Sequence, residues 1–203
     1  MNLMNLINAL PGAMAQGLIW GIMAIGVYIT FRILDIADLT VDGTLCTGGA
    51  VCIMMMQSGQ NVWVSMAVAL IAGMLAGMVT GLLHTFMGIP AILAGILTQL
   101  GLYSVNLKIM GKANQAINVD KFDLLVSLRY IKGVPFYKNT ILIVALMILV
   151  LIVFLYWFFG TELGCSLRAT GCNDRMARAQ GINTDFNRVL GLMISNGMVA
   201  LSG

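Results

Sequence analysis

The chain has 203 residues, of which 60% are hydrophobic and only 9% are charged. A soluble domain carries about 25% charged residues, so this chain has too few charges to cover a surface that faces water. With a net charge of only +3, the composition excludes a secreted disulfide scaffold, a disordered chain and a protein that binds nucleic acid, and it indicates an all-α bundle of transmembrane helices.

The first charge-free stretch, residues 1–31, predicts a membrane span. No Lys or Arg precedes Arg32, so the basic start of a cleaved signal peptide is missing, and the apolar run is longer than a signal peptide needs. Proline suits the first turn of a helix. We therefore expect a helix that starts near Pro11 and crosses the membrane over residues 14–31.

A charged cluster follows the first span and contains Arg32, Asp35, Asp38 and Asp42. Ionisable groups at membrane depth cost about 2.5–3.5 kcal/mol on insertion scales, and they normally face a cavity or a partner. Asp38 and Asp42, with Thr40 between them, are therefore candidates for lining the translocation path. The alternative is a turn at the membrane surface that faces water, with Arg32 paired to Asp35.

The uncharged residues 43–83 predict two helices, separated by the polar stretch 57–61. The first helical stretch, 43–56, is too short to span a hydrocarbon core of about 30 Å. Either this helix starts earlier and includes the two aspartates, or it is a broken or re-entrant element.

The second of these stretches, residues 62–83, is long enough to span the membrane. It carries Gly73, Gly77 and Gly81, and small residues at this four-residue spacing let another helix approach closely. A further span is predicted over 90–106. Its start at Pro90 is similar to a half-helix whose positive end faces a substrate carboxylate, which makes Pro90 another candidate for the path.

Two polar segments flank the most apolar span, residues 139–160. The loop 108–138 carries six basic residues and the segment 161–188 carries four. Because one span separates them, they face opposite sides of the membrane, and the positive-inside rule favours the first loop inside. The final 15 residues reach only about 22 Å, so we expect residues 1–203 to be a single membrane domain of a longer natural chain.

The segment 161–188 contains a short helix with clear start and stop signals. Asn173 suits the N-cap, Asp174 suits the positive end of the helix dipole and Gly181 suits the position after the helix end. Such a helix either lies flat on the bilayer or docks into a groove of a soluble partner.

The faces of this short helix differ in polarity. Cys172, Met176 and Ala179 follow the spacing i, i+4, i+7 and predict one apolar stripe. Arg175 and Arg178 lie on a different side of the helix.

The same segment resembles the cytoplasmic coupling loop of ABC importer permeases that serve branched-chain amino acids, ribose and related sugars. The resemblance is carried by Gly164, the run Ser166-Leu167-Arg168-Ala169-Thr170-Gly171, Asn173, Ala177, Ala179 and Gly181-Ile182. In that family the loop docks into a groove of the ATP-hydrolysing subunit. The resemblance therefore implies a coupling surface in 161–188 that consists of Gly164, Arg168, Gly171, Asn173, Arg175, Met176, Ala177, Ala179 and Gly181.

Two further stretches carry a resemblance within this family. Residues 37–43, Ala-Asp-Leu-Thr-Val-Asp-Gly, resemble the Asp-Leu-Ser-Val-Gly stretch of the sugar permeases, from which Asp42 departs. Residues 40–43 together with 89–98, Ile-Pro-Ala-Ile-Leu-Ala-Gly-Ile-Leu-Thr, look closer to permeases that work with amino-acid-binding proteins, of the tryptophan and tyrosine type.

The resemblance implies a transport subunit and not an enzyme: a multi-pass permease of a bacterial-type inner membrane that moves a small polar solute, expected to be an amino acid. The implied partners are an identical second subunit, a cytoplasmic ABC ATPase, an extracytoplasmic substrate-binding protein and membrane lipid. No GxxxxGK[ST] run is present, so ATP and Mg²⁺ are expected on the ATPase and no cofactor on this chain. The coupling loop would then be cytoplasmic, against the positive-inside count.

The alternative function is a secondary transporter or channel that an ion gradient drives. It predicts charged residues within several spans, whereas only Asp38 and Asp42 are candidates here. No metal site is expected, because the four cysteines form no CxxC pair and His84 is the only histidine. The sixteen methionines favour packing over copper binding.

Overall fold

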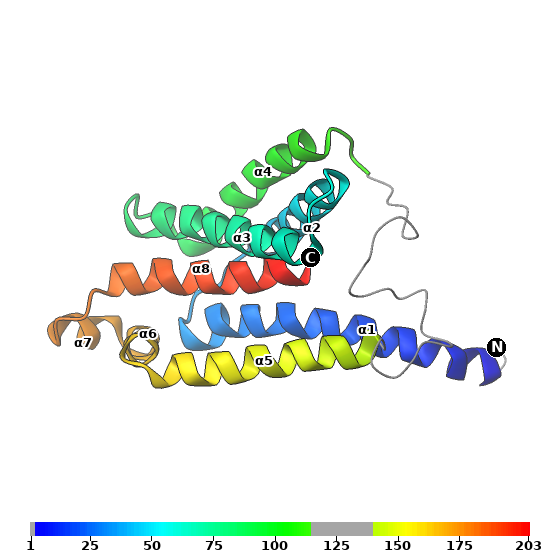
Figure 1. The fold of residues 1–203 in the computed structure, drawn as a ribbon. Coiled ribbons are helices and arrows are strands. Elements are labelled where there is room, and N and C mark those ends of the chain that lie inside the picture. The colour runs from blue at the N-terminus through cyan, green and yellow to red at the C-terminus, as the bar shows by residue number, and fades with distance from the viewer. Residues whose placement is uncertain (1–2, 115–139) are drawn as a thin grey trace.

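The computed structural model describes residues 3–114 and 140–203, and the elements in this part of the chain are all helices joined by short non-helical segments. Figure 1 shows the helices side by side in an elongated bundle, with α6 and α7 at one end and the N-terminus at the other. The elements are α1 Leu3–Tyr28, η1 Ile29–Ile33, α2 Val41–Gln57, α3 Val62–Thr85, α4 Ala91–Met110, α5 Thr140–Gly160, α6 Glu162–Cys172, α7 Asp174–Ala179 and α8 Thr184–Ser202. The predicted all-α membrane bundle is confirmed.

Four helices in the described residues are long and apolar enough to cross a membrane: Leu10–Ile33, Val62–Thr85, Ala91–Met110 and Ile141–Gly160. Most of their ends lie within a few residues of the ends of the four predicted spans. The expectation that Pro11 starts the first helix is wrong, because Pro11 lies inside α1. The residues before it are also largely apolar, and a backbone in an apolar medium must satisfy its own hydrogen bonds, which favours continuing the helix.

The helical structure is interrupted between α1 and α2, and neither sequence alternative for the helix at 43–56 holds in full, because α2 is continuous and starts only two residues earlier. The end of α1 widens into the π-helical turn η1, in which the N–H of Leu34 donates to the carbonyl of Ile29 at 3.1 Å. Asp35 then has a φ of +57°, a left-handed conformation that aspartate tolerates better than most residues. The chain runs on without helical structure until α2 begins at Val41, so α2 includes Asp42 but not Asp38.

The helix α8 occupies the centre of the bundle. Ten of its 19 residues are buried, and it lies between α3 and α1 in Figure 1. The glycine stripe of α3 faces it: a Cβ added at Gly77 would overlap the carbonyl of Leu192, and one at Gly81 would lie 2.9 Å from the Cα of Val189. The close helix approach that the spacing predicted is therefore confirmed, with α8 as the partner.

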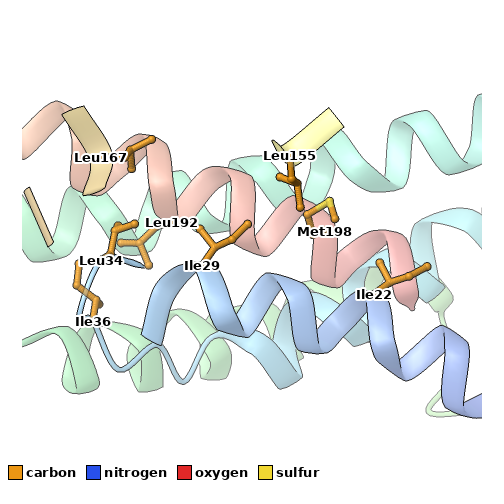
Figure 2. Close-up of a cluster of buried hydrophobic side chains, with 8 residues drawn as sticks. All are labelled: Ile22, Ile29, Leu34, Ile36, Leu155, Leu167, Leu192 and Met198. Carbon is orange, nitrogen blue, oxygen red and sulfur yellow. The ribbon is translucent and has the colours of Figure 1, made fainter. Parts of the chain in front are cut away.

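A cluster of buried apolar side chains joins α1, α5, α6 and α8 with the segment that follows η1. Figure 2 shows its eight members, Ile22, Ile29, Leu34, Ile36, Leu155, Leu167, Leu192 and Met198. In lipid, such contacts stabilise a fold through close packing, because the lipid tails are as apolar as the side chains. The cluster fixes α6 to the bundle, since Leu167 is fully buried within it.

Replacing Gly77 with alanine is expected to destabilise the bundle. The added methyl group would meet backbone atoms of α8 that cannot rotate away, and overpacking of this kind costs about 1–3 kcal/mol. Unfolding of the detergent-purified protein by SDS, followed by circular dichroism, measures the loss. The matched control is Gly101→Ala in α4, where a Cβ would meet nothing within 4 Å. Equal stability of the two variants would contradict the close α3–α8 contact.

Candidate functional site

The short helix α6 is attached to the end of α5 by two of the predicted coupling residues. A Cβ at Gly164 would lie 2.9 Å from the carbonyl carbon of Phe159, so the two backbones touch. Arg168 donates from Nη2 to the carbonyl oxygen of Phe159 at 2.8 Å. This bond satisfies a free carbonyl of α5 and places a positive charge at the negative end of its dipole. Gly164 and Arg168 therefore anchor α6.

A third predicted residue, Gly171, attaches α6 to the end of the first span. A Cβ on Gly171 would overlap the carbonyl of Ile33 and lie 3.0 Å from the Cα of Leu34. On the other side of α6, Asn187 of α8 donates from Nδ2 to the hydroxyl of Thr170 at 2.9 Å. α6 is thus held between α1, α5 and α8.

The helix α7 has the start and stop that the sequence predicted. The side chain of Asn173 accepts a hydrogen bond from the N–H of Met176 at 3.1 Å. Gly181 has a φ of +84°, and its N–H donates to the carbonyl of Arg178 at 2.9 Å, while the N–H of Ile182 donates to that of Ala177 at 3.1 Å. These two bonds form a Schellman motif, which ends α7 sharply.

The predicted apolar stripe of α7 is wrong in one member. Cys172 is the last residue of α6, because Asn173 takes an extended conformation in order to cap the next helix. Only Met176 and Ala179 of the stripe lie on α7, and both are exposed, Met176 by 60%. The residue that faces inward is Ala177, which is 2% exposed.

Charged side chains join α7 to the first turns of α8. Arg178 contacts the carboxylate of Asp185 at 2.7 Å, and Arg188 contacts that of Asp174 at 3.2 Å. These pairs are partly exposed, so each contributes at most about 1 kcal/mol, but together they fix the direction of α7. Neither Asp185 nor Arg188 was among the predicted site residues, because both lie on the next helix.

Four residues of α7 are exposed, and one of them, Arg178, pairs with Asp185 of α8. The outward surface of α7 therefore consists of the other three, Arg175, Met176 and Ala179. We call these three residues the α7 surface. The other predicted coupling residues hold it in place: Gly164, Arg168, Gly171, Asn173, Ala177 and Gly181.

Replacing Asn173 with alanine removes the cap of α7 and is expected to loosen that helix. Loss of an N-cap costs about 1 kcal/mol, equivalent to roughly fivefold faster local opening. Hydrogen exchange of the amides at 175–179, read by mass spectrometry, measures it. Asn173→Asp keeps a capping oxygen and should exchange like the native chain. Equal protection in the alanine variant would show that the cap adds nothing.

A second group of polar side chains lies at the break between α1 and α2. Asp38 accepts a hydrogen bond from Asn196 of α8 at 2.7 Å and another from its neighbour, the N–H of Thr40, at 2.8 Å. The hydroxyl of Thr44 donates to Asn196 Oδ1 at 2.9 Å, and the hydroxyls of Thr40 and Thr80 lie 2.9 Å apart. We call these five residues the break cluster.

The break cluster joins three helices, and all its side chains are buried except that of Asp38, which is partly exposed. Thr40, Thr44 and Asn196 are 0% exposed. Asp42, in contrast, is exposed in the first turn of α2 and takes no part in the cluster. The alternative interpretation of residues 32–42 was a turn that faces water, with Arg32 paired to Asp35. The pairing is wrong, because the described residues contain no ion pair between Arg32 and Asp35.

Pro90 lies at the α7 end of the bundle. It precedes α4 and lines a cavity of about 490 Å³ together with Gly171, Asn173 and Asp174. This position at the α7 end of the bundle counts against the half-helix hypothesis, and the role of Pro90 stays a prediction. The turn before Pro90 is held there by His84, whose Nδ1–H donates to the carbonyl of Ile89 at 2.8 Å.

Four apolar spans in the described residues, a helical break and a short helix with an outward surface define a polytopic membrane protein. Residues 10–203 match the family of permease components of branched-chain amino acid transport systems. The chain belongs to this family, whose members are inner-membrane permeases of ABC importers and not enzymes.

Curated relatives support the assignment. The chain is 36% identical over 196 residues to the tyrosine transport system permease protein of Clostridioides difficile (strain R20291), covering 97% of this chain and 63% of that protein. It is 37% identical over 198 residues to an uncharacterized protein of Rickettsia prowazekii (strain Madrid E), covering 97% and 66%. An autoinducer 2 import system permease protein of Yersinia pestis (strain Pestoides F) is 31% identical over 153 residues, covering 74% and 41%.

The chain thus spans less than two thirds of the length of the relatives that it matches. No solved structure matches it.

Proposed function

We propose that this chain forms the membrane path of an ATP-driven importer of an amino acid. The family supports the import function, and the name of the relative from Clostridioides difficile, a tyrosine transport permease, supports an amino acid as the solute. The solute would be delivered by a separate binding protein at the end of the bundle opposite α7. A second copy of the chain would complete the path.

The observation that carries the proposal is that α7 is held rigidly while one of its apolar side chains is exposed. This helix is capped at both ends and fixed to α8, yet the α7 surface holds an apolar side chain, Met176, that is 60% exposed. An exposed apolar side chain on a rigid helix is suited to a groove in a partner protein. We propose that the partner is a cytoplasmic ATPase, which binds ATP and Mg²⁺ itself and drives transport through α7.

This proposal also sets the topology. The α7 end of the bundle would face the cytoplasm, and the N-terminus, which lies at the other end in Figure 1, would face outward. The loop 108–138, whose sequence carries six basic residues, would then lie outside. Residues 115–138 of it fall outside the described part of the chain.

The test replaces Met176 with aspartate in the full-length chain in its native host. The tagged protein is purified in mild detergent, co-purifying ATPase is quantified, and tyrosine uptake is measured in cells. We expect Met176→Asp to lose the ATPase and most uptake, and Met176→Leu, which keeps an apolar side chain, to retain both. A bound ATPase and full uptake in Met176→Asp would contradict docking on α7. No ATPase with the native chain would favour transport driven by an ion gradient.

A further inference from the structure

We infer that Asn196 is a positioning residue that passes a movement of α7, through α8, to the break between α1 and α2. This inference rests on the proposed function, because it assumes that a partner moves α7. It assigns to α8 a role in coupling, in addition to its role as the packing centre of the bundle.

The first step is the firm attachment of α8 to the coupling helices. Within its first five residues, α8 contacts α7 and α6 through four side chains. The hydroxyl of Thr184 accepts from Arg178 Nε at 2.7 Å. Asp185 pairs with Arg178 at 2.7 Å, Arg188 pairs with Asp174 at 3.2 Å and Asn187 donates to Thr170 at 2.9 Å. A displacement of α7 therefore displaces the start of α8.

The second step is that α8 carries this displacement into the membrane. It is a continuous helix from Thr184 to Ser202, so Asn187 and Asn196 are separated by about 14 Å of rigid backbone. The glycine stripe of α3 packs directly against α8, so α8 cannot bend toward α3, because a Cβ at Gly77 or Gly81 would already crowd α8. Tightly packed helices respond to a push by small shear movements.

The third step is the set of hydrogen bonds that joins Asn196 to the break between α1 and α2. Its amide donates to Asp38 at 2.7 Å and to the carbonyl of Leu192 at 3.0 Å, and its oxygen accepts from Thr44 at 2.9 Å. Asp38 lies in the non-helical segment between η1 and α2, which deforms more readily than a helix. Movement of α8 therefore pulls on Asp38 and on the start of α2.

The charge of Asp38 makes this bond specific. Within residues 3–114 and 140–203, no Lys or Arg forms an ion pair with Asp38, and its carboxylate accepts from Asn196 and from the N–H of Thr40. A hydrogen bond to a charged acceptor is stronger than one between neutral groups, particularly away from water. Loss of the Asn196 donor would leave the carboxylate attached only to its own segment.

The experiment exchanges the two side chains. In the complex of full-length permease and ATPase, reconstituted with the binding protein in liposomes, Asn196→Asp sets two carboxylates against each other. The double variant Asp38→Asn with Asn196→Asp restores one donor and one acceptor. The measured quantity is the amount of tyrosine, used as the probe, that is taken up per ATP hydrolysed.

We expect Asn196→Asp to assemble with the ATPase and to lower uptake per ATP by about tenfold, and the double variant to recover most of it. Ser195→Ala is the matched control, because Ser195 is equally buried on α8 but donates to Gly26 of α1 at 2.7 Å. It should keep the native ratio. If Asn196→Asp does not assemble, Asn196→Ser, which introduces no charge, should assemble with a lowered ratio.

Three results would overturn the inference: an unchanged ratio in the assembled single variant, no recovery in an assembled double variant, or an equal loss in Ser195→Ala. Failure of both single variants at Asn196 to assemble would also overturn it, since Asn196 would then serve folding alone. Failure of the proposed function is distinguishable, because the native complex would then couple no ATP hydrolysis to uptake.

Discussion

Replacing Gly181 with valine is expected to reduce uptake by about tenfold while the membrane helices remain folded. Gly181 holds a φ of +84°, and a β-branched residue there costs about 1–3 kcal/mol. The chain would avoid this cost by giving up the Schellman hydrogen bonds that end α7. The α7 surface would then lose its fixed direction. Uptake of labelled tyrosine, normalised to the amount of permease in the membrane, measures the effect.

The control for this prediction is Gly181→Asn. Asparagine adopts the left-handed conformation more readily than other L residues, and a Cβ at this position would meet nothing within 4 Å. Uptake by Gly181→Asn should therefore stay within about twofold of the native value. Native uptake by Gly181→Val would show that the end of α7 plays no part in coupling.

The elements that the sequence predicted well are those with local signals. The spans follow from uninterrupted apolar runs, which need no knowledge of their neighbours. The ends of α7 follow from Asn173 and Gly181, each of which acts within four residues of its own position. The glycine stripe of α3 predicted a close helix contact but not the identity of the partner, because spacing on one helix carries no information about the other.

The break cluster could not be predicted as a whole, because its members come from distant parts of the chain. Asp38 and Asn196 are separated by 158 positions in the sequence. Asn196 gave a weak signal, as a polar residue in an otherwise apolar stretch. Asp38 and Thr40 were among the predicted site residues, but the charge rule that selected Asp38 also selected Asp42, which the structure places on the exposed side of α2.

The predicted coupling residues illustrate a second limit. A family motif records every position that the loop needs and does not separate residues that touch a partner from residues that hold the loop. The structure makes this separation through burial and contact: Gly164 and Gly171 touch backbone of other helices, whereas Met176 is exposed. The two groups therefore predict different consequences of mutation.

Gly171→Val tests this division directly, and we expect it to lower the amount of folded permease several-fold. Its Cβ would overlap the carbonyl of Ile33, and since the neighbour is backbone, the helices α6 and α1 must separate. Overpacking of a tight contact costs about 1–3 kcal/mol, a large part of the stability of a typical domain. Fluorescence-detected size exclusion of the tagged protein measures the folded fraction.

The comparison that decides the role of Gly171 uses two other variants. Gly160→Val, at the end of α5, adds the same side chain where nothing lies within 4 Å and should accumulate normally. Met176→Asp should also accumulate normally and lose only the ATPase. If Gly171→Val accumulated to the native level and lost only the ATPase, Gly171 would belong to the docking surface, and the contact between α6 and the end of α1 would be looser than the structure places it.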